Sequence, residues 1–446
     1  MANFIKFLLG QNNTTNRVLP KVETLKIVVV EFSEYGNFGF GRGMFKLLQK
    51  NPSFDVRYFD EPFDKSFLNL HGRNFFDLVD FGNTLLQKLN TDVIIWGYQD
   101  NENIRLNFQT ANAYSDWENV SCSILESLFI PAEHLEHVNF FPEILENIIT
   151  GIIATSISEQ RIDLRYLKQK LLKKVVAKFD TEDTPENRKL MQSPYIMNAI
   201  ALIYLHYLQK ELNQKKVDMI RDLLNNALSY KNQIMQNVHI GCIYKNFGQL
   251  FELAIKQEIG NSWFLFKDAI SNYRTAQKYL DHYNCPYDFA MISFKLSQLY
   301  FRYWKFSNDI QALRDAVFFL REAEKTFNQI SFPDLWSKIE GYLGFYLSLL
   351  GLFSKSNEIS KLAIKSYKNK QTVYRKELYP VMWAKIQENI ANVYYNMGKN
   401  SKDQTLFANA IDYYKSALRV YESKKLNNEI GIVNTSMDKV IRAWKG

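Results

Sequence analysis

The residues near the start of the chain that are best suited to chemistry are three glycines and an aspartate. Gly39, Gly41 and Gly43 follow one apolar run, and Asp60 ends the next. Glycines between a strand and a helix can seat a pyrophosphate on the helix N-terminus, while a carboxylate holds the ribose. The spacing is not G-x-G-x-x-G, and neither Lys nor Ser or Thr follows as in a P-loop. Two interpretations stay open: a nucleotide-binding or sensing site, or a tight loop that requires glycine.

His134 and His137 are a second candidate, because Glu133 and Glu136 stand beside them. Imidazole and carboxylate groups on one helical face can bind a metal ion. The order differs from His-Glu-x-x-His, and no third ligand stands near, so surface histidines on an acidic helix are favoured. No Ser or Cys lies in a nucleophile-elbow sequence. We therefore expect no metal, no cofactor and no enzymatic activity.

A third candidate is a basic segment between residues 164 and 178. Its cations alternate with apolar residues, and they are Arg165, Lys168, Lys170, Lys173, Lys174 and Lys178. A basic amphipathic helix can bind nucleic acid or a membrane surface. The more ordinary interpretation is a helix of the array described next, with a solvated charged face.

The rear of the chain consists of repeats that must position such residues. One signature places an apolar residue, a small residue and then Tyr or Leu at i, i+1 and i+4, and it recurs every 47 residues at Leu296-Ser297, Leu343-Gly344 and Ile390-Ala391. The same step separates Pro286, Pro333 and Pro380, and also Ala269, Ala316, Ala363 and Ala410. Because the small-residue signature, the prolines and the alanines all share one period, the sequence contains a repeat array.

Each repeat is predicted to be a pair of helices. The small residue of the first helix lets the second helix approach closely, and the proline suits the start of a first helix. Weaker copies occur at Ile200-Ala201 and Phe247-Gly248. We therefore expect five first helices, beginning near Ile200, and a weaker sixth unit from Asn427.

This pattern resembles tetratricopeptide repeats. The best match is carried by Pro333, Trp336, Leu343, Gly344, Gly351, Ala363 and Tyr367. The tetratricopeptide unit has 34 residues, whereas this one has 47. An extended variant and another two-helix solenoid, such as an armadillo-like array, both remain open. The resemblance implies a groove, lined by the first helices, that binds a peptide or protein.

The front of the chain reads as a small α/β domain. Strands are predicted at residues 25–32, 54–60, 92–98 and 104–110, with a helix at 44–50 after the glycines and another at 74–89. The order β-α-β-α-β-β predicts a parallel core with an antiparallel edge. The stretches 27–32, 39–43, 91–97 and 104–108 resemble the small domain of TolB amino-terminal and CsgG-like proteins. That resemblance covers residues 24–114 and implies a binding or assembly module.

Charge is unevenly distributed. Residues 1–160 hold 12 Lys and Arg against 20 Asp and Glu, and residues 161–446 hold 43 against 27. The basic repeats can attract an acidic partner or the chain's own acidic front, or simply reflect a lysine-rich composition. The chain has three scattered cysteines and no secretory leader at its start, so we expect a cytoplasmic protein without a transmembrane segment.

The fold class expected is therefore an α+β multidomain protein, in which a small α/β domain precedes an all-α helical-hairpin solenoid. The expected parts are a tail at 1–22, the α/β domain at 23–118, acidic bridging helices at 119–160 and the solenoid at 161–446.

The function expected is that of a non-enzymatic scaffold or adaptor. It binds a protein or peptide segment, which can be acidic, and no nucleic acid. Nucleotide sensing at Gly39–Gly43 and binding of nucleic acid or membrane by the basic repeats are the alternatives. The candidate peptide-binding residues are Lys245, Gln249, Phe294, Gln298, Arg302, Lys338, Phe345, Lys385, Asn392 and Asn396. Substitution of Lys338 and Lys385 by Glu is expected to weaken partner binding without unfolding the array.

Overall fold

The computed structural model places two compact units along the chain, and the division falls between residues 292 and 293, within one helix. The structure describes residues 24–32, 39–60, 82, 84–99, 103–110, 128–131, 143–157, 161, 163–179, 188, 191–209, 211–231 and 235–445. Each unit is described by itself below.

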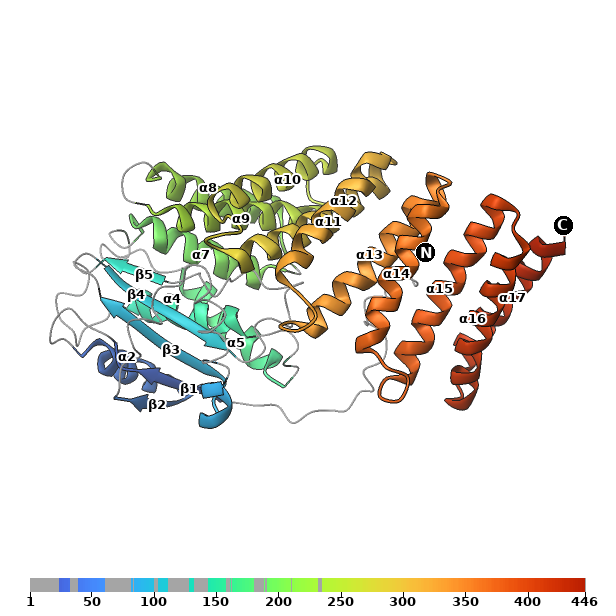
Figure 1. Cartoon of the computed structure of the whole chain (residues 1–446). Coiled ribbons are helices and arrows are strands. Elements are labelled where there is room, and N and C mark those ends of the chain that lie inside the picture. Colours follow the sequence, from blue (N-terminus) through green and yellow to red (C-terminus); the bar gives the residue numbers. More distant parts are fainter. Residues whose placement is uncertain are drawn as a thin grey trace. The chain divides into compact units, whose positions relative to one another are not determined.

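The first unit contains a five-stranded sheet in the order β2-β1-β3-β4-β5 (Figure 1). The strands are β1 (Leu25–Val30), β2 (Phe54–Phe59), β3 (Val93–Gln99), β4 (Asn103–Thr110) and β5 (Leu128–Pro131). β1 pairs in parallel with β2 and β3, while β3, β4 and β5 pair antiparallel. The predicted parallel core with an antiparallel edge is confirmed.

Helices cover the sheet because its central strands are apolar on both faces. Leu25, Ile27 and Val29 share a core with α2 (Phe40–Gln49) and α4 (Glu143–Ser156). On β1, Val28 and Val30 are also buried. Residues 84–89 are helical and agree with the end of the second predicted helix.

Two features of this unit differ from the sequence-based expectation. Strand β5 was not predicted, and it pairs with β4 so that Ile130 lies opposite Ile104. Helix α2 begins at Phe40 and not at Met44, so that Gly41 and Gly43 lie inside the helix. Only Gly39 precedes it, in the left-handed conformation with φ of 60°.

The other described elements of the first unit are helices, and their core is continuous with that of the sheet. The helices are α5 (Arg165–Phe179), α7 (Pro194–Tyr207), α8 (Gln214–Ser229), α9 (Asn237–Lys256), α10 (Ser262–Tyr279) and the start of α11 (Pro286–Ser307). Helix α7 packs against α4, α5 and β5 as well as against α8 and α9. One cluster of buried apolar residues therefore runs from Leu25 to Ala254.

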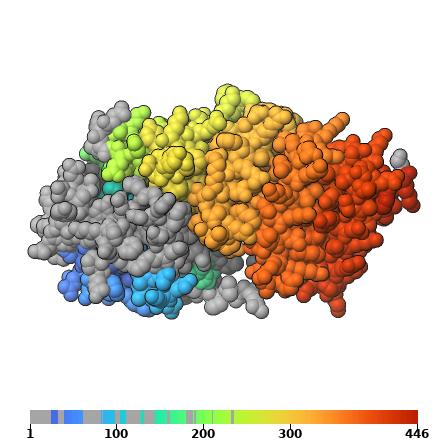
Figure 2. Space-filling model, in the orientation of Figure 1, coloured from blue at the N-terminus to red at the C-terminus, as the bar shows by residue number. Residues whose placement is uncertain are grey.

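The second unit continues with helices that pack in pairs adjacent in sequence. After the end of α11 come α12 (Ile310–Thr326), α13 (Pro333–Phe353), α14 (Asn357–Val373), α15 (Pro380–Ser401), α16 (Gln404–Ser423) and α17 (Asn427–Lys445). Figure 2 shows this unit as successive bands from orange to red. The expected α+β fold with a helical solenoid is confirmed.

The repeated small residues lie where two helices of a pair meet. A Cβ atom added at Gly344 of α13 would come 2.8 Å from the Tyr367 ring of α14, and one at Gly248 of α9 would come 2.7 Å from the ring of Tyr273 in α10. Such distances exclude a larger residue without movement of the ring. The repeat therefore conserves a close approach of two helices.

The ends of the helices follow the same period. Pro333 and Pro380 occupy the first turns of α13 and α15, as predicted. The turns between the helices of a pair contain Asn308, Lys355 and Lys402, each with a φ between 50° and 56°. These three residues are 47 positions apart, so the left-handed turn belongs to the repeat.

Candidate functional site

The residues predicted to bind a peptide occupy two different environments. Gln249, Gln298, Arg302, Lys338, Phe345, Asn392 and Asn396 are half-buried, whereas Lys245, Phe294 and Lys385 are buried. In the second unit, Gln298, Phe345 and Asn392 hold equivalent positions on α11, α13 and α15, 47 residues apart. We call the accessible side of these helices the first-helix surface: Gln298, Arg302, Lys338, Tyr342, Phe345, Asn392 and Asn396.

On α13 this surface is a narrow stripe. Lys338, Tyr342 and Phe345 follow at i, i+4 and i+7, and all three are half-buried on a helix whose other positions are mostly buried. Gln298 Nε2 donates a hydrogen bond to Tyr342 Oη at 3.4 Å, which links α11 to α13. Tyr342 was absent from the sequence-based candidates, although its place one turn from both Lys338 and Phe345 is the signal that could have identified it.

Aromatic rings support the stripe from below. Phe294 is fully buried, and its ring centroid lies 5.4 Å from that of Tyr342 in an edge-on contact. Phe301 contacts Phe345 and Tyr346 at 5.5 and 4.4 Å. Phe294 therefore lies buried beneath the surface and supports Tyr342.

Lys385 is committed to an internal ion pair. Its Nζ lies 2.9 Å from both carboxylate oxygens of Glu388, and the two side chains are 10% and 4% exposed. Tyr421 donates a hydrogen bond to Glu388 Oε2 at 3.2 Å, and burial followed by Glu388 raises the pKa of Tyr421. A glutamate at position 385 would therefore disturb α15 itself.

The glycine segment holds a carboxylate of the chain. Glu31 Oε1 accepts hydrogen bonds from the backbone N–H of Gly41 at 2.9 Å and of Phe32 at 2.8 Å. Tyr58 donates a hydrogen bond to the other oxygen, and burial together with Glu31 raises the pKa of Tyr58. The place at the start of α2 where a phosphate would bind thus holds Glu31.

His134 and His137 lie outside the described residues. Across the part of the chain that the structure describes, no group of three or more His, Cys, Asp or Glu residues could hold a metal ion. His239 is buried against the rings of Phe129 and Tyr195, and its burial, followed by the charge of Arg105, lowers its pKa to about 3.

The basic segment forms helix α5, whose two faces differ sharply. Leu167, Leu171, Leu172, Val175 and Val176 are buried, and Lys168 is buried with them. Lys168 Nζ donates a hydrogen bond to the carbonyl oxygen of Ile157 at 2.8 Å, just after α4 ends. A cation at a helix C-terminus is stabilising, so Lys168 helps to hold α5 against α4.

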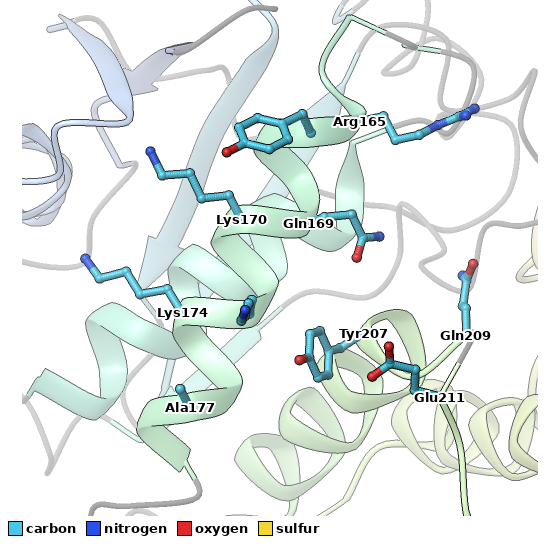
Figure 3. A pocket seen from close by; sticks show the side chains of 10 residues that line it. Arg165, Gln169, Lys170, Lys174, Ala177, Tyr207, Gln209 and Glu211 are labelled. Carbon is cyan, nitrogen blue, oxygen red and sulfur yellow. The ribbon is translucent and has the colours of Figure 1, made fainter.

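The opposite face of α5 forms one wall of a cavity of about 880 Å³ (Figure 3). This wall contributes the cations Arg165, Lys170, Lys173 and Lys174, together with Tyr166, Gln169 and Ala177. The other wall is Tyr207 of α7 with Gln209 and Glu211 of the turn that follows. We call this the basic cavity, because its described lining has four cations and one carboxylate.

No protein-family model matches the sequence, and no curated protein is significantly similar to it. Among the described helices, none has both the length and the apolar character needed to cross a membrane.

Proposed function

We propose that this protein is a non-enzymatic scaffold or adaptor whose helical repeats bind a segment of another protein. The observation that carries the proposal is the first-helix surface, where equivalent positions of consecutive repeats stay accessible while many of the other positions of each helix are buried. Stacked two-helix repeats commonly use such extended surfaces for binding. The proposal includes a relationship to tetratricopeptide repeats and an adaptor role in the cytoplasm.

The composition of the surface supports a protein ligand with carboxylate groups. Tyr342 and Phe345 offer aromatic area, and Arg302 and Lys338 offer charge-assisted hydrogen bonds. Aromatic residues and Arg are enriched among the residues that dominate binding energies at protein interfaces. Gln298, Asn392 and Asn396 add side-chain amides, which can bond to the backbone of an extended or helical segment.

A nucleotide-sensing role at the glycines has less support from the geometry. Glu31 already accepts the hydrogen bond of the Gly41 N–H, and a phosphate there would have to displace a carboxylate. Thermal stabilisation by nucleotides would still reveal such a site, because a ligand at 100 times its Kd adds about 2.7 kcal/mol. Because Glu31 occupies this place, we expect nucleotides to leave the thermal midpoint unchanged.

Site-specific photo-crosslinking in the native cell tests the scaffold role. A photoreactive amino acid is placed at Gln298, Phe345 or Asn396, and, as matched controls, at the exposed Lys325 or Lys361 of the second helices. We expect the same partner to be captured from several first-helix positions and from neither control. Equal capture from both sets of positions would argue against this surface.

A further inference from the structure

The basic cavity has a composition that a protein-binding scaffold does not explain. Arg165, Lys170, Lys173 and Lys174 are all exposed, and the last lies nine positions after the first on the helix, a length of about 13.5 Å at 1.5 Å per residue. Among the described residues, Lys170, Lys173 and Lys174 form no ion pair. Lys170, Lys173 and Lys174 therefore carry positive charge that no described carboxylate neutralises.

We propose that the basic cavity binds single-stranded nucleic acid, with its phosphates along α5 and its bases in the space toward the end of α7. Sites for single strands combine cations that follow the backbone with aromatic rings on which bases stack. The cavity provides both, because Tyr166 is 58% exposed and Tyr207 lines the other wall. Gln169 and Gln209 add amide groups that can bond to base edges.

The charges of the two walls give the strand its orientation. Glu211, the only carboxylate among the described residues of the lining, lies on the wall opposite α5. Figure 3 shows Lys170 and Lys174 extending from one side of α5, while Gln169 lies on the side toward Tyr207, Gln209 and Glu211. Phosphates are repelled by Glu211 and attracted to α5, so the uncharged bases belong near Tyr207 and Gln209.

Other polyanions fit less well. Double-stranded DNA is read by a helix that enters the major groove, but α5 is packed against α4 and α7. A flat bilayer cannot enter a cavity, and apart from Tyr166 and Ala177 the accessible face of α5 is polar. An acidic protein segment would satisfy the lysines but would leave the two rings and two amides without a role. This proposal departs from the sequence-based expectation that the chain binds no nucleic acid.

The proposal is tested by fluorescence anisotropy on the full chain. The probes are a labelled twelve-residue oligothymidylate, a duplex of the same length, a labelled oligoglutamate peptide and vesicles with anionic lipid. We expect the single strand to bind most tightly and the slope of log K against log salt to lie near −2 to −3, about −0.7 for each of three or four cations. Absence of oligothymidylate binding at low salt would overturn the proposal, as would tighter binding of the duplex, the peptide or the vesicles.

Three variants distinguish binding in the basic cavity from binding by positive charge elsewhere on the chain. The double variant Lys173→Gln/Lys174→Gln is expected to weaken oligonucleotide binding at least tenfold, whereas Lys365→Gln/Lys368→Gln on α14 removes the same charge from exposed positions and is expected to have little effect. Tyr166→Ala should weaken binding about five- to hundredfold, because stacking on one base is worth about 1–3 kcal/mol. Equal losses in both double variants, or an unchanged affinity of Tyr166→Ala, would contradict the proposal.

Discussion

At the scale of single residues, two buried charged groups show where sequence patterns stop being informative. Lys385 has the helical register of a surface lysine, but it lies with Glu388 inside the second unit. Glu340, which is 0% exposed, accepts a hydrogen bond from Asn369 at 2.6 Å. Helical periodicity gives the side of a helix on which a residue lies, but it does not give the partner that an adjacent helix supplies.

Removal of Glu388 is predicted to be strongly destabilising. Glu388→Gln leaves Lys385 buried without its counterion, and breaking a buried pair in this way costs about 3–5 kcal/mol. The double variant Lys385→Met/Glu388→Leu removes both charges and should recover most of that loss. Urea unfolding followed by circular dichroism gives both values. If Glu388→Gln were as stable as the unmodified chain, the ion pair would contribute nothing to the free energy of unfolding.

Glu340 is predicted to make stability depend on pH. Burial, opposed by hydrogen bonds from Asn369 and Ser366 and reinforced by Glu324, raises the pKa of Glu340 to about 7. The folded chain then binds more protons than the unfolded chain between about pH 4.5 and 7, so stability falls as the pH rises through this window. Glu340→Gln should remove up to about 3 kcal/mol of this dependence and should be more stable than the unmodified chain near pH 7.5.

The measurement is the thermal midpoint between pH 5 and 8, with Glu377→Gln, an exposed glutamate of the same unit, as the control. The control should keep the pH dependence of the unmodified chain. Parallel curves for Glu340→Gln and the unmodified chain would rule out this role of Glu340.

At the scale of elements, the small-residue contacts set the distance between paired helices. Gly344→Ala is predicted to destabilise the second unit, because the added methyl group would meet the Tyr367 ring at 2.8 Å and overpacking costs about 1–3 kcal/mol. The matched variant Gly431→Ala in α17 has no atom within 4 Å of the new methyl group. It should instead stabilise by up to about 1 kcal/mol through helix propensity. Thermal midpoints that shift in the same direction would contradict this prediction.

A single side chain joins two helix pairs at the wall of the basic cavity. Gln257 Oε1 accepts a hydrogen bond from the Leu212 N–H at 3.0 Å, and its Nε2 donates to the carbonyl oxygens of Leu208 at 3.1 Å and Gln209 at 2.8 Å. These partners lie in the turn between α7 and α8, which also carries Glu211. Gln257 thus fixes the wall that faces α5.

Gln257→Leu is predicted to loosen this turn. Backbone groups that lose their partners cost about 1–3 kcal/mol each when buried, and the Leu212 amide should exchange its hydrogen faster. Hydrogen–deuterium exchange with mass spectrometry measures this change locally. The control is Gln311→Leu, because Gln311 is exposed and its side chain, among the contacts described, bonds only to Asp315 of its own helix. Unchanged exchange at residues 208–212 would show that Gln257 does not hold the turn.

The boundaries of the helices could be predicted better than the small strand. Pro333 and Pro380 start helices as their fixed φ suggests, because this feature is local. Strand β5 has four residues within an acidic stretch and gains its hydrogen bonds from β4, so no local pattern identifies it. The start of α2 was predicted too late because the glycines were taken for a loop. Gly41 instead lies in the helix, where α2 closely approaches Glu31.

At the scale of the whole molecule, the repeat was predictable because it is found by comparing the chain with itself. The 47-residue period of prolines and alanines predicted the paired helices from α10 to α16. The basic cavity could be predicted only in part. The sequence indicated the cations of α5, but Tyr207, Gln209 and Glu211 belong to a different segment, and only tertiary packing brings them opposite α5.

The central claim is that the first-helix surface of the repeats binds a protein segment. The most direct measurement is the affinity of the crosslinked segment, made as a labelled peptide, for the unmodified chain and for two charge reversals. Lys338→Glu is predicted to weaken binding at least tenfold while the thermal midpoint stays unchanged, and Lys361→Glu on the exposed side of α14 is predicted to have no effect. Equal affinities for Lys338→Glu and the unmodified chain would contradict the claim.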